Sequence, residues 1–370
     1  MKKYKVLDLF AGAGGLSLGF FWAGFEIIGA VDNMEESCTT FKKNHKNSTV
    51  ICDDIKKITP EKLSRKIGNN IDIILGGPPC QGLSLAGKRL ADDPRNELFL
   101  DFVKYVDYFK PSAFLMENVP GLLSIKNGET HRAILKAFKD IGYNNFYDHK
   151  PTVLLAANYG VPQLRNRLFY LGTKGKTPIN FPPKQTHFPQ TKTDNISIFD
   201  HSELSYITVE QAIGDLPSLK SGGGAEEMDY TKAPSSDYQK LMRKDSKKIY
   251  NHVAPNHTRQ LNKMIKNTKS GGSVDPNYSD SRRWDKDQPS FTIKALGAGG
   301  GSTNRRAFHY QDLRGSTVRE NARIQSFPDS YRFYGSKTMQ MTQVGNAVPP
   351  ILALRIAETI RDGLDQNKII

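Results

Sequence analysis

The sequence predicts an α/β protein with a doubly wound, mostly parallel sheet and a second, smaller domain of irregular structure. Short apolar runs alternate with helical patterns up to about Gly172, the alternation then stops, and an amphipathic pattern returns near the end. Strands that alternate with helices form parallel sheets with right-handed crossovers. A chain of 370 residues is long enough for one large domain or two modest ones.

The individual elements follow from apolar spacing. Helix Leu98–Tyr108 is predicted because Leu98, Phe102 and Tyr105 share one helical face. A closing helix is predicted after Val348, with an apolar stripe that packs back on the first domain. That stripe consists of Leu352, Ile356, Ile360 and Leu364. The predicted strands are Val6–Phe10, Ile27–Val31, Ile71–Leu75, Ala113–Glu117, Val153–Ala156 and Arg167–Leu171.

The charge balance favours a polyanionic partner. The chain has 52 Lys and Arg against 38 Asp and Glu, a net charge of +14. The segment Lys232–Lys269 holds ten basic residues against Asp237 and Asp245. A solvated helix face is the plain explanation of such a run, but in an irregular domain it favours a nucleic-acid surface.

Cysteine and histidine usage excludes several classes of site. The three cysteines include no C-x-x-C pair, which argues against a disulfide framework and a zinc site and for a reducing compartment. The eight histidines show no metal-ligand spacing. No signal segment precedes Val6, and the longest apolar stretch, Gly15–Val31, is interrupted by Ser17 and Glu26. We therefore expect a cytoplasmic protein without a metal.

The first chemical motif is a glycine-rich turn that follows the first strand. Glycines between a strand and a helix let the backbone approach a nucleotide-like ligand. Asp32 ends the next strand, 20 residues after Gly12, where it can bind ribose hydroxyls. Because Ser17 departs from the dinucleotide fingerprint, nicotinamide and S-adenosylmethionine both remain open, as does a turn without a ligand. Asp54 follows a short third strand and is a candidate partner for an adenine amino group.

The second motif presents one thiol at the end of a buried strand. Gly76–Gly77 and Pro78–Pro79 lead directly into Cys80. The prolines fix the backbone, and the carboxyl end of a parallel strand is the usual place for a ligand. A lone cysteine is normally a core filler, but this setting favours a nucleophile.

Six short motifs occur in order along the chain. They are Phe10–Gly14 (FAGAG), Gly77–Gln81 (GPPCQ), Met116–Val119 (MENV), Gln163–Arg167 (QLRNR), Arg319–Pro328 (RENARIQSFP) and Gly345–Pro349 (GNAVP). Together they resemble the ordered motif set of the DNA (cytosine-5) methyltransferases, especially the bacterial restriction-modification members. The resemblance covers nearly the whole chain, apart from Lys174 to about Arg283.

The resemblance implies a Rossmann-like methyltransferase fold that uses S-adenosylmethionine. Residues 1–185 are then a catalytic and cofactor-binding domain, 186–333 a target-recognition domain, and 334–370 a segment that returns to the catalytic domain.

The resemblance also implies a covalent mechanism. Cys80 adds to carbon 6 of cytosine, which makes carbon 5 nucleophilic enough to accept a methyl group. Glu117 ends an apolar strand, where burial favours its protonated form, and it acts on ring nitrogen 3. Arg165 and Arg167 steady the cytosine carbonyl, the Glu117 carboxylate and the loop. The alternative for Glu117 is a structural role in holding a loop. The alternative for Arg165 and Arg167 is a position on the solvated surface.

The predicted cofactor-binding residues come mostly from the first domain. Asn33 departs from the commoner family pattern, in which a bulky residue stacks on adenine, so Met34 or Phe10 is expected to take that role. Asn346 either touches the amino-acid part of the cofactor or caps a helix. The full set is Phe10, Gly12, Gly14, Leu16, Asp32, Asn33, Asp54, Ile55, Pro78, Leu98 and Asn346.

The predicted partner is double-stranded DNA, from which the target base must be flipped to reach Cys80. A segment over residues 83–95 resembles a closing loop, with Ser84, Lys88, Arg89 and Arg95 as DNA contacts, and Arg305 and Arg306 are candidate readers. Arg319 and Arg323 are read as structural or phosphate-binding.

The resemblance points to a nucleoid-associated, monomeric enzyme that protects host DNA from a companion endonuclease. A tRNA cytosine-5 methyltransferase and a catalytically silent DNA-binding regulator remain the alternatives.

Overall fold

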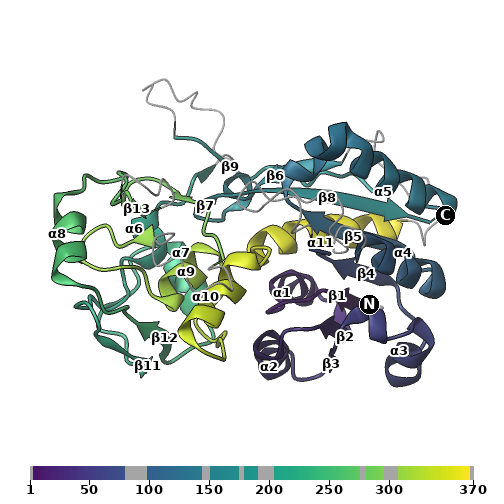
Figure 1. The fold of residues 1–370 in the computed structure, drawn as a ribbon, viewed down its shortest axis with the longest axis horizontal. Coiled ribbons are helices and arrows are strands. Elements are labelled where there is room, and N and C mark those ends of the chain that lie inside the picture. The colour runs from purple at the N-terminus through teal and green to yellow at the C-terminus, as the bar shows by residue number, and fades with distance from the viewer. Residues whose placement is uncertain are drawn as a thin grey trace. The chain divides into compact units, whose positions relative to one another are not determined.

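The chain forms two compact units (Figure 1). The computed structural model describes residues 3–79, 98–143, 151–174, 179–190, 204–275, 281–295 and 307–366. Unit 1 comprises Met1–Leu155, Asn166–Lys184 and Ala353–Ile370, and unit 2 comprises Ala156–Arg165 and Gln185–Leu352. Compared with the domains predicted from the sequence, residues 156–165 and 334–352 group with the second unit.

Within the described residues, unit 1 is built on a seven-stranded sheet in the order β3-β2-β1-β4-β5-β8-β6. Strands β1 to β5 run parallel, whereas β8 is antiparallel to β5 and β6. The predicted α/β class with a mostly parallel sheet is confirmed. The strands are β1 Lys5–Leu9, β2 Glu26–Asp32, β3 Thr49–Cys52, β4 Ile73–Gly76, β5 Ala113–Asn118, β6 Thr152–Leu155 and β8 Asn166–Thr173.

Helices cover this sheet and bury its apolar side chains. One core cluster joins Leu7, Leu9 and Ile74 of the sheet to Leu63, Phe102 and Phe138, which come from α3, α4 and α5. The four stripe residues of the closing helix α11 are all buried, and this helix contacts the start of the chain through Tyr4 Oη and Asp365, 2.7 Å apart. The helices are α1 Gly15–Trp22, α2 Glu35–Asn44, α3 Pro60–Ile67, α4 Leu98–Phe109, α5 Glu129–Asp140 and α11 Pro350–Gln366, with 3-10 turns η1 Ile55–Lys57 and η4 Pro120–Gly128.

The strand order reverses between β1 and β4, the central strand of the described sheet. Ligands of open α/β sheets bind outside the carboxyl ends of the strands at such a reversal. The glycine-rich turn follows β1, and the Gly77–Pro79 loop follows β4. The fold therefore brings the two principal sequence motifs to one edge of one sheet.

Unit 2 is less regular, as predicted, and its sheets in the described residues are two-stranded. Its helices are α6 Val209–Ile213, α7 Asp237–Arg243, α8 Arg259–Asn267, α9 Val318–Ile324 and α10 Lys337–Asn346, with the 3-10 turn η6 Ala156–Tyr159. Its strands are β7 Gln163–Leu164, β9 His187–Phe188, β10 Leu204–Ser205, β11 Gly224–Met228, β12 Ile249–Val253, β13 Arg282–Arg283, β14 Ser290–Phe291 and β15 Ala307–Phe308.

Buried ion pairs stabilise the centre of unit 2. Arg323 is fully buried, donates to Asp329 at 2.6 and 2.7 Å, and donates to Asp215 Oδ1 at 3.1 Å. Arg319 is also fully buried and donates to the backbone carbonyls of Tyr250, Pro328 and Tyr331. Both arginines of the Arg-Glu-x-x-Arg motif therefore have structural contacts, one of the two roles that the sequence favoured.

No helix in the described part of the chain is both long and apolar enough to cross a membrane. The same residues contain no cluster of His, Cys, Asp and Glu side chains suited to holding a metal ion.

Candidate active site

The glycine-rich turn after β1 is tied to the end of β2 by one carboxylate. The Gly12 N–H donates to Asp32 Oδ2 at 2.8 Å, and the Met34 N–H donates to Asp32 Oδ1 at 2.9 Å. Burial raises the pKa of Asp32, while these backbone donors oppose that shift. Asp32 therefore fixes both the turn after its neighbouring strand and the start of its own loop.

Gly12 and Gly14 are required in this turn for two different physical reasons. Gly12 (φ 53°) faces open space where a side chain would stand, so the backbone can be approached closely there. Gly14 (φ 85°) leaves no such room, because a Cβ there would lie 2.8 Å from atoms of His45 and Phe41. Sequence analysis did not single out His45, whose ring stacks on Phe41 at 4.4 Å and whose pKa burial lowers to about 4.

A buried carboxyl group lies under the same turn. Ser17 Oγ of α1 donates to Asp8 Oδ2 of β1 at 2.6 Å, and Asp8 is 1% exposed. Burial raises the pKa of Asp8 to about 7, and the neighbouring Asp32 adds to this. Ser17, which breaks the dinucleotide fingerprint, thus joins the helix to the strand. A polar residue inside an apolar strand was the available signal for Asp8.

The end of β3 supplies the next pair of acids. The Asp53 N–H donates to the carbonyl of Asp32 at 3.0 Å, which joins the ends of β3 and β2. Asp54 caps the turn η1 by accepting from the Lys56 N–H at 3.0 Å, and Ile55 is buried. Asn33, between β2 and α2, is exposed.

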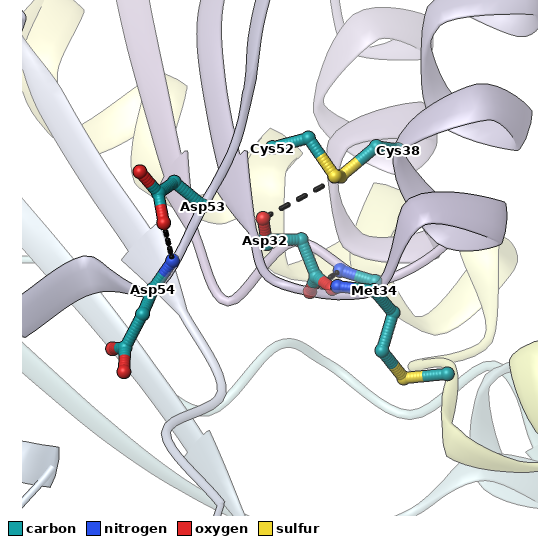
Figure 2. Close-up of a disulfide and its surroundings, with 7 residues drawn as sticks. Asp32, Met34, Cys38, Cys52, Asp53 and Asp54 are labelled. Atoms are coloured by element: carbon teal, nitrogen blue, oxygen red, sulfur yellow. Dashed lines mark hydrogen bonds between the residues drawn. A yellow bond between two sulfur atoms is a disulfide. The ribbon is translucent and has the colours of Figure 1, made fainter. Parts of the chain in front are cut away.

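Two cysteines lie beside these acids (Figure 2). Cys38 in the first turns of α2 forms a disulfide with Cys52, the last residue of β3. The sequence argued against a disulfide framework and did not foresee this single pair. The spacing of 14 residues carried no pairing signal, because the contact depends on how β3 lies beside β2.

The end of β5 holds the loop that leads to Cys80. Asn118 Nδ2 donates to the carbonyl of Pro78 at 3.1 Å, and a Cβ at Gly77 would lie 3.0 Å from Glu117 Oε2. Arg167 of β8 pairs with Glu117, with Nε 2.9 Å from Oε1, and both side chains are 13% exposed. Burial lowers the pKa of Arg167, and the Glu117 carboxylate opposes this shift. A mostly buried acid thus lies beside the predicted nucleophile loop.

The second predicted catalytic arginine belongs to unit 2. Arg165 is fully buried and donates to the carbonyls of Ile293 and Gly345 at 2.7 Å and of Ala347 at 3.1 Å. These contacts join β7 to the segment after β14 and to the end of α10 within that unit. Arg165 therefore has an evident structural role beside the predicted catalytic one.

Comparison with known proteins decides the family. The sequence model described as C-5 cytosine-specific DNA methylase matches residues 4–362. The chain belongs to this family.

Similar members of known name cover almost the full length of this methylase. The type II methyltransferase M.DdeI of Desulfomicrobium norvegicum is 39% identical over 96% of this chain and 88% of its own. The type II methyltransferase M1.HphI of Haemophilus parahaemolyticus is 37% identical over 96% of this chain and 86% of its own. A crystal structure of a prophage-encoded E. coli protein, assigned as a DNA modification methyltransferase, covers 98% of this chain and all of its own, with 27% identity and a TM-score of 0.80.

The other predicted residues of the methylase differ in burial and position. Leu98 opens α4 and packs against the core cluster, as does Phe10 after β1, and Leu16 is buried in α1. Asn346 is exposed and ends α10, whereas the closing helix begins at Pro350, so the expected cap on that helix is wrong. Outside the described residues lie Cys80, Ser84, Lys88, Arg89, Arg95, Arg305 and Arg306.

Proposed function

We propose that this methylase takes its methyl group from S-adenosylmethionine and transfers it to carbon 5 of one cytosine in a short duplex DNA sequence. The observation that carries the proposal is the packing of the Gly77–Pro79 loop against Glu117 and Asn118. This packing sets the residues directly before Cys80 beside a mostly buried carboxyl group that a guanidinium holds in place.

The residues at the ends of β1 to β3 suit the cofactor. The open space at Gly12 lets a ligand approach the backbone, and Asp32 offers carboxylate oxygens to ribose hydroxyls. Asp54 is assigned to the adenine amino group, and buried Ile55 to the adjacent apolar wall. Bound there, the cofactor supplies an electrophilic methyl group on a sulfonium.

The protein groups then prepare the base for that methyl group. The Cys80 thiolate bonds to carbon 6, and Glu117, in its protonated form, gives its proton to ring nitrogen 3, so electron density gathers at carbon 5. After methylation a water molecule takes the proton from carbon 5, the bond to carbon 6 breaks so that Cys80 leaves as a thiolate, and the proton on nitrogen 3 returns to Glu117. Arg167 keeps the Glu117 carboxyl group pointed at the base. The catalytic role of Arg165 stays a prediction from the sequence.

Unit 2 is assigned to DNA through the basic face of α8. Arg259, Lys263 and Lys266 are exposed and recur at helical spacing, while Ile265 on the opposite side packs against Phe308. Lys and Arg on such a face neutralise phosphates and release counterions. The α8 face therefore supports a grip on the DNA backbone rather than readout of bases.

The setting that we propose is a restriction-modification system. Support comes from the relatives in Desulfomicrobium norvegicum and Haemophilus parahaemolyticus, both of which are called type II methyltransferases. A companion endonuclease that cuts the unmethylated sequence is part of this proposal.

The first experiment identifies the methylated nucleoside. Purified protein is incubated with methyl-labelled S-adenosylmethionine and either mixed-sequence duplex DNA or tRNA, and the product is digested to nucleosides. We expect label in 5-methylcytosine from DNA, and none with Cys80→Ser, which should still bind DNA and cofactor. Label in tRNA alone, in N4-methylcytosine or in N6-methyladenine would contradict the proposal, and cofactor binding without any transfer would favour a silent regulator.

A second experiment tests the α8 face through salt dependence. Lys263→Gln should weaken binding to any duplex and reduce the slope of log affinity against log salt by about 1. Lys240→Gln is the matched control, because Lys240 is exposed on α7 but pairs with Asp237 at 2.9 Å. Equal slopes for the parent and Lys263→Gln would exclude a phosphate contact at this position.

A further inference from the structure

The Cys38–Cys52 disulfide joins α2 to the end of β3, beside the residues predicted to bind adenosine (Figure 2). Asp32 and Cys52 are register partners at the ends of β2 and β3. From Asp32 the chain runs through Asn33 and Met34 into α2, where Cys38 bonds back to Cys52. Asp32, assigned to ribose, and the stacking candidate Met34 therefore lie between two attachments, whereas Asp54 and Ile55 follow the second attachment directly.

Strand β3 gains a second, covalent attachment through this disulfide. It is the terminal strand in the order of the described sheet, is four residues long and has no fully buried residue. Its hydrogen-bonded partner is β2, so the covalent link to α2 is a separate constraint. Asp53, Asp54 and Ile55 follow immediately, so the position of the end of β3 sets the position of the adenine edge.

The Cys38 sulfur has a different partner in each redox state. It lies 3.4 Å from the carbonyl of Asp32, which a thiol S–H can reach as a donor. In the disulfide that hydrogen is absent, and the Asp32 carbonyl still accepts from the Asp53 N–H at 3.0 Å. Both states thus leave the end of β2 with a backbone partner, while only the disulfide ties β3 to α2.

We propose that Cys38 and Cys52 are a redox-responsive pair that reacts with low-molecular-weight disulfides, and that the disulfide form binds the adenosine group more tightly than the dithiol form. The inference rests on the proposed function for its ligand. The Cα atoms are 5.8 Å apart, within the usual range for a disulfide. The physical basis is that a tethered β3 loses less backbone freedom when the ligand orders it.

The exchange balances with one molecule of oxidant. Cys52 is exposed, so its thiolate attacks a sulfur of the small disulfide and releases one thiolate. Cys38 is 6% exposed and attacks the mixed disulfide at Cys52, which releases the second. The two protein thiols lose two protons, and the two small thiolates take them up.

The test uses the full chain with Cys80→Ser, which leaves Cys38 and Cys52 as its two cysteines. The protein is equilibrated with glutathione disulfide or with dithiothreitol, its free thiols are titrated, and S-adenosylhomocysteine binding is measured calorimetrically. We expect no free thiol and about tenfold tighter binding in the oxidised form, the factor for ordering about one backbone residue. By linkage, saturating ligand should favour the disulfide by the same factor.

Control variants and a second readout separate this inference from the proposed function. Cys52→Ser in the same background should bind S-adenosylhomocysteine with the affinity of the dithiol form, with or without oxidant. Cys38→Ala should give the same result. Two free thiols after oxidation, or equal affinities of the two forms for S-adenosylhomocysteine, would overturn this inference but not the proposed function. Binding in neither state would contradict the cofactor assignment. Hydrogen exchange at the Asp53 and Asp54 amides then decides: slower exchange in the oxidised form supports the tether, and equal exchange overturns it.

Discussion

Replacing Asp8 with Asn should remove a pH dependence that a buried carboxyl group imposes on the stability of unit 1. Asp8 is 1% exposed and accepts a hydrogen bond from Ser17 Oγ at 2.6 Å. Because an ionised carboxylate loses its hydration there, burial raises the pKa of Asp8 from 3.8 to about 7. The amide of Asn keeps the shape and can accept the same hydrogen bond, but it does not ionise.

The size and sign of the effect follow from proton linkage. Between pH 3.8 and about 7 the folded protein keeps a proton on Asp8 that the unfolded chain releases. The free energy of unfolding therefore falls as pH rises through this window, by about 1.4 kcal/mol for each pH unit. Over about three units the loss is about 4 kcal/mol, complete above about pH 7. Asp8→Asn should be more stable than the parent by up to this amount at pH 8.5, and the difference should shrink towards pH 5.

The assay is urea unfolding of both proteins between pH 5 and 8.5. Asp140→Asn, on the exposed face of α5 where Asp140 pairs with Lys136, is the control and should run parallel to the parent. Parallel curves for Asp8→Asn and the parent across the whole range would refute the reasoning, since Asp8 would then bind its proton equally in both states.

Two further predictions concern single side chains. Arg323→Met should destabilise unit 2 by about 3–5 kcal/mol, because it leaves the buried carboxylates of Asp215 and Asp329 without their shared cation; a loss below about 1 kcal/mol in urea unfolding would contradict this. Asp32→Asn removes one carboxylate acceptor from the backbone around Gly12 and should weaken S-adenosylhomocysteine binding by about 10- to 100-fold, measured calorimetrically, with an unchanged circular dichroism spectrum. Unchanged affinity would show that Asp32 does not serve the ligand.

The sheet and its motif-bearing edge could be predicted from the sequence. Strand β4 is buried at every position and therefore appears as a continuous apolar run. Asp32 could be placed because a strand end is a local feature, and the fixed distance from Gly12 reflects one strand-helix-strand unit. The closing helix was predictable from the spacing of Leu352 and Ile356, both of which are buried.

Contacts between distant segments could not be predicted in the same way. Arg323 lies in a recognised motif, yet its partner Asp215 is 108 residues away and carries no local signal. The pairing of Cys38 with Cys52 depends on the register of β3. Arg165 and Arg167 stand two residues apart, which in a continuous strand would point both side chains to one face, but β7 ends at Leu164 and β8 begins at Asn166, so the alternation does not run through Arg165.

The contacts at the carboxyl edge of unit 1 share one design, in which each strand end holds the loop of a neighbour. Asp32 holds the turn at Gly12 through its side chain and Asp53 through its carbonyl. Across the reversal point, Asn118 holds the carbonyl of Pro78. Such loops are preorganised by groups that lie one strand away, so little ordering is left for the moment when ligand binds. The same arrangement links the outermost strand of the described sheet to the glycine-rich turn. A displacement of β3 moves Asp53, which is hydrogen-bonded to Asp32, and Asp32 in turn holds the turn at Gly12.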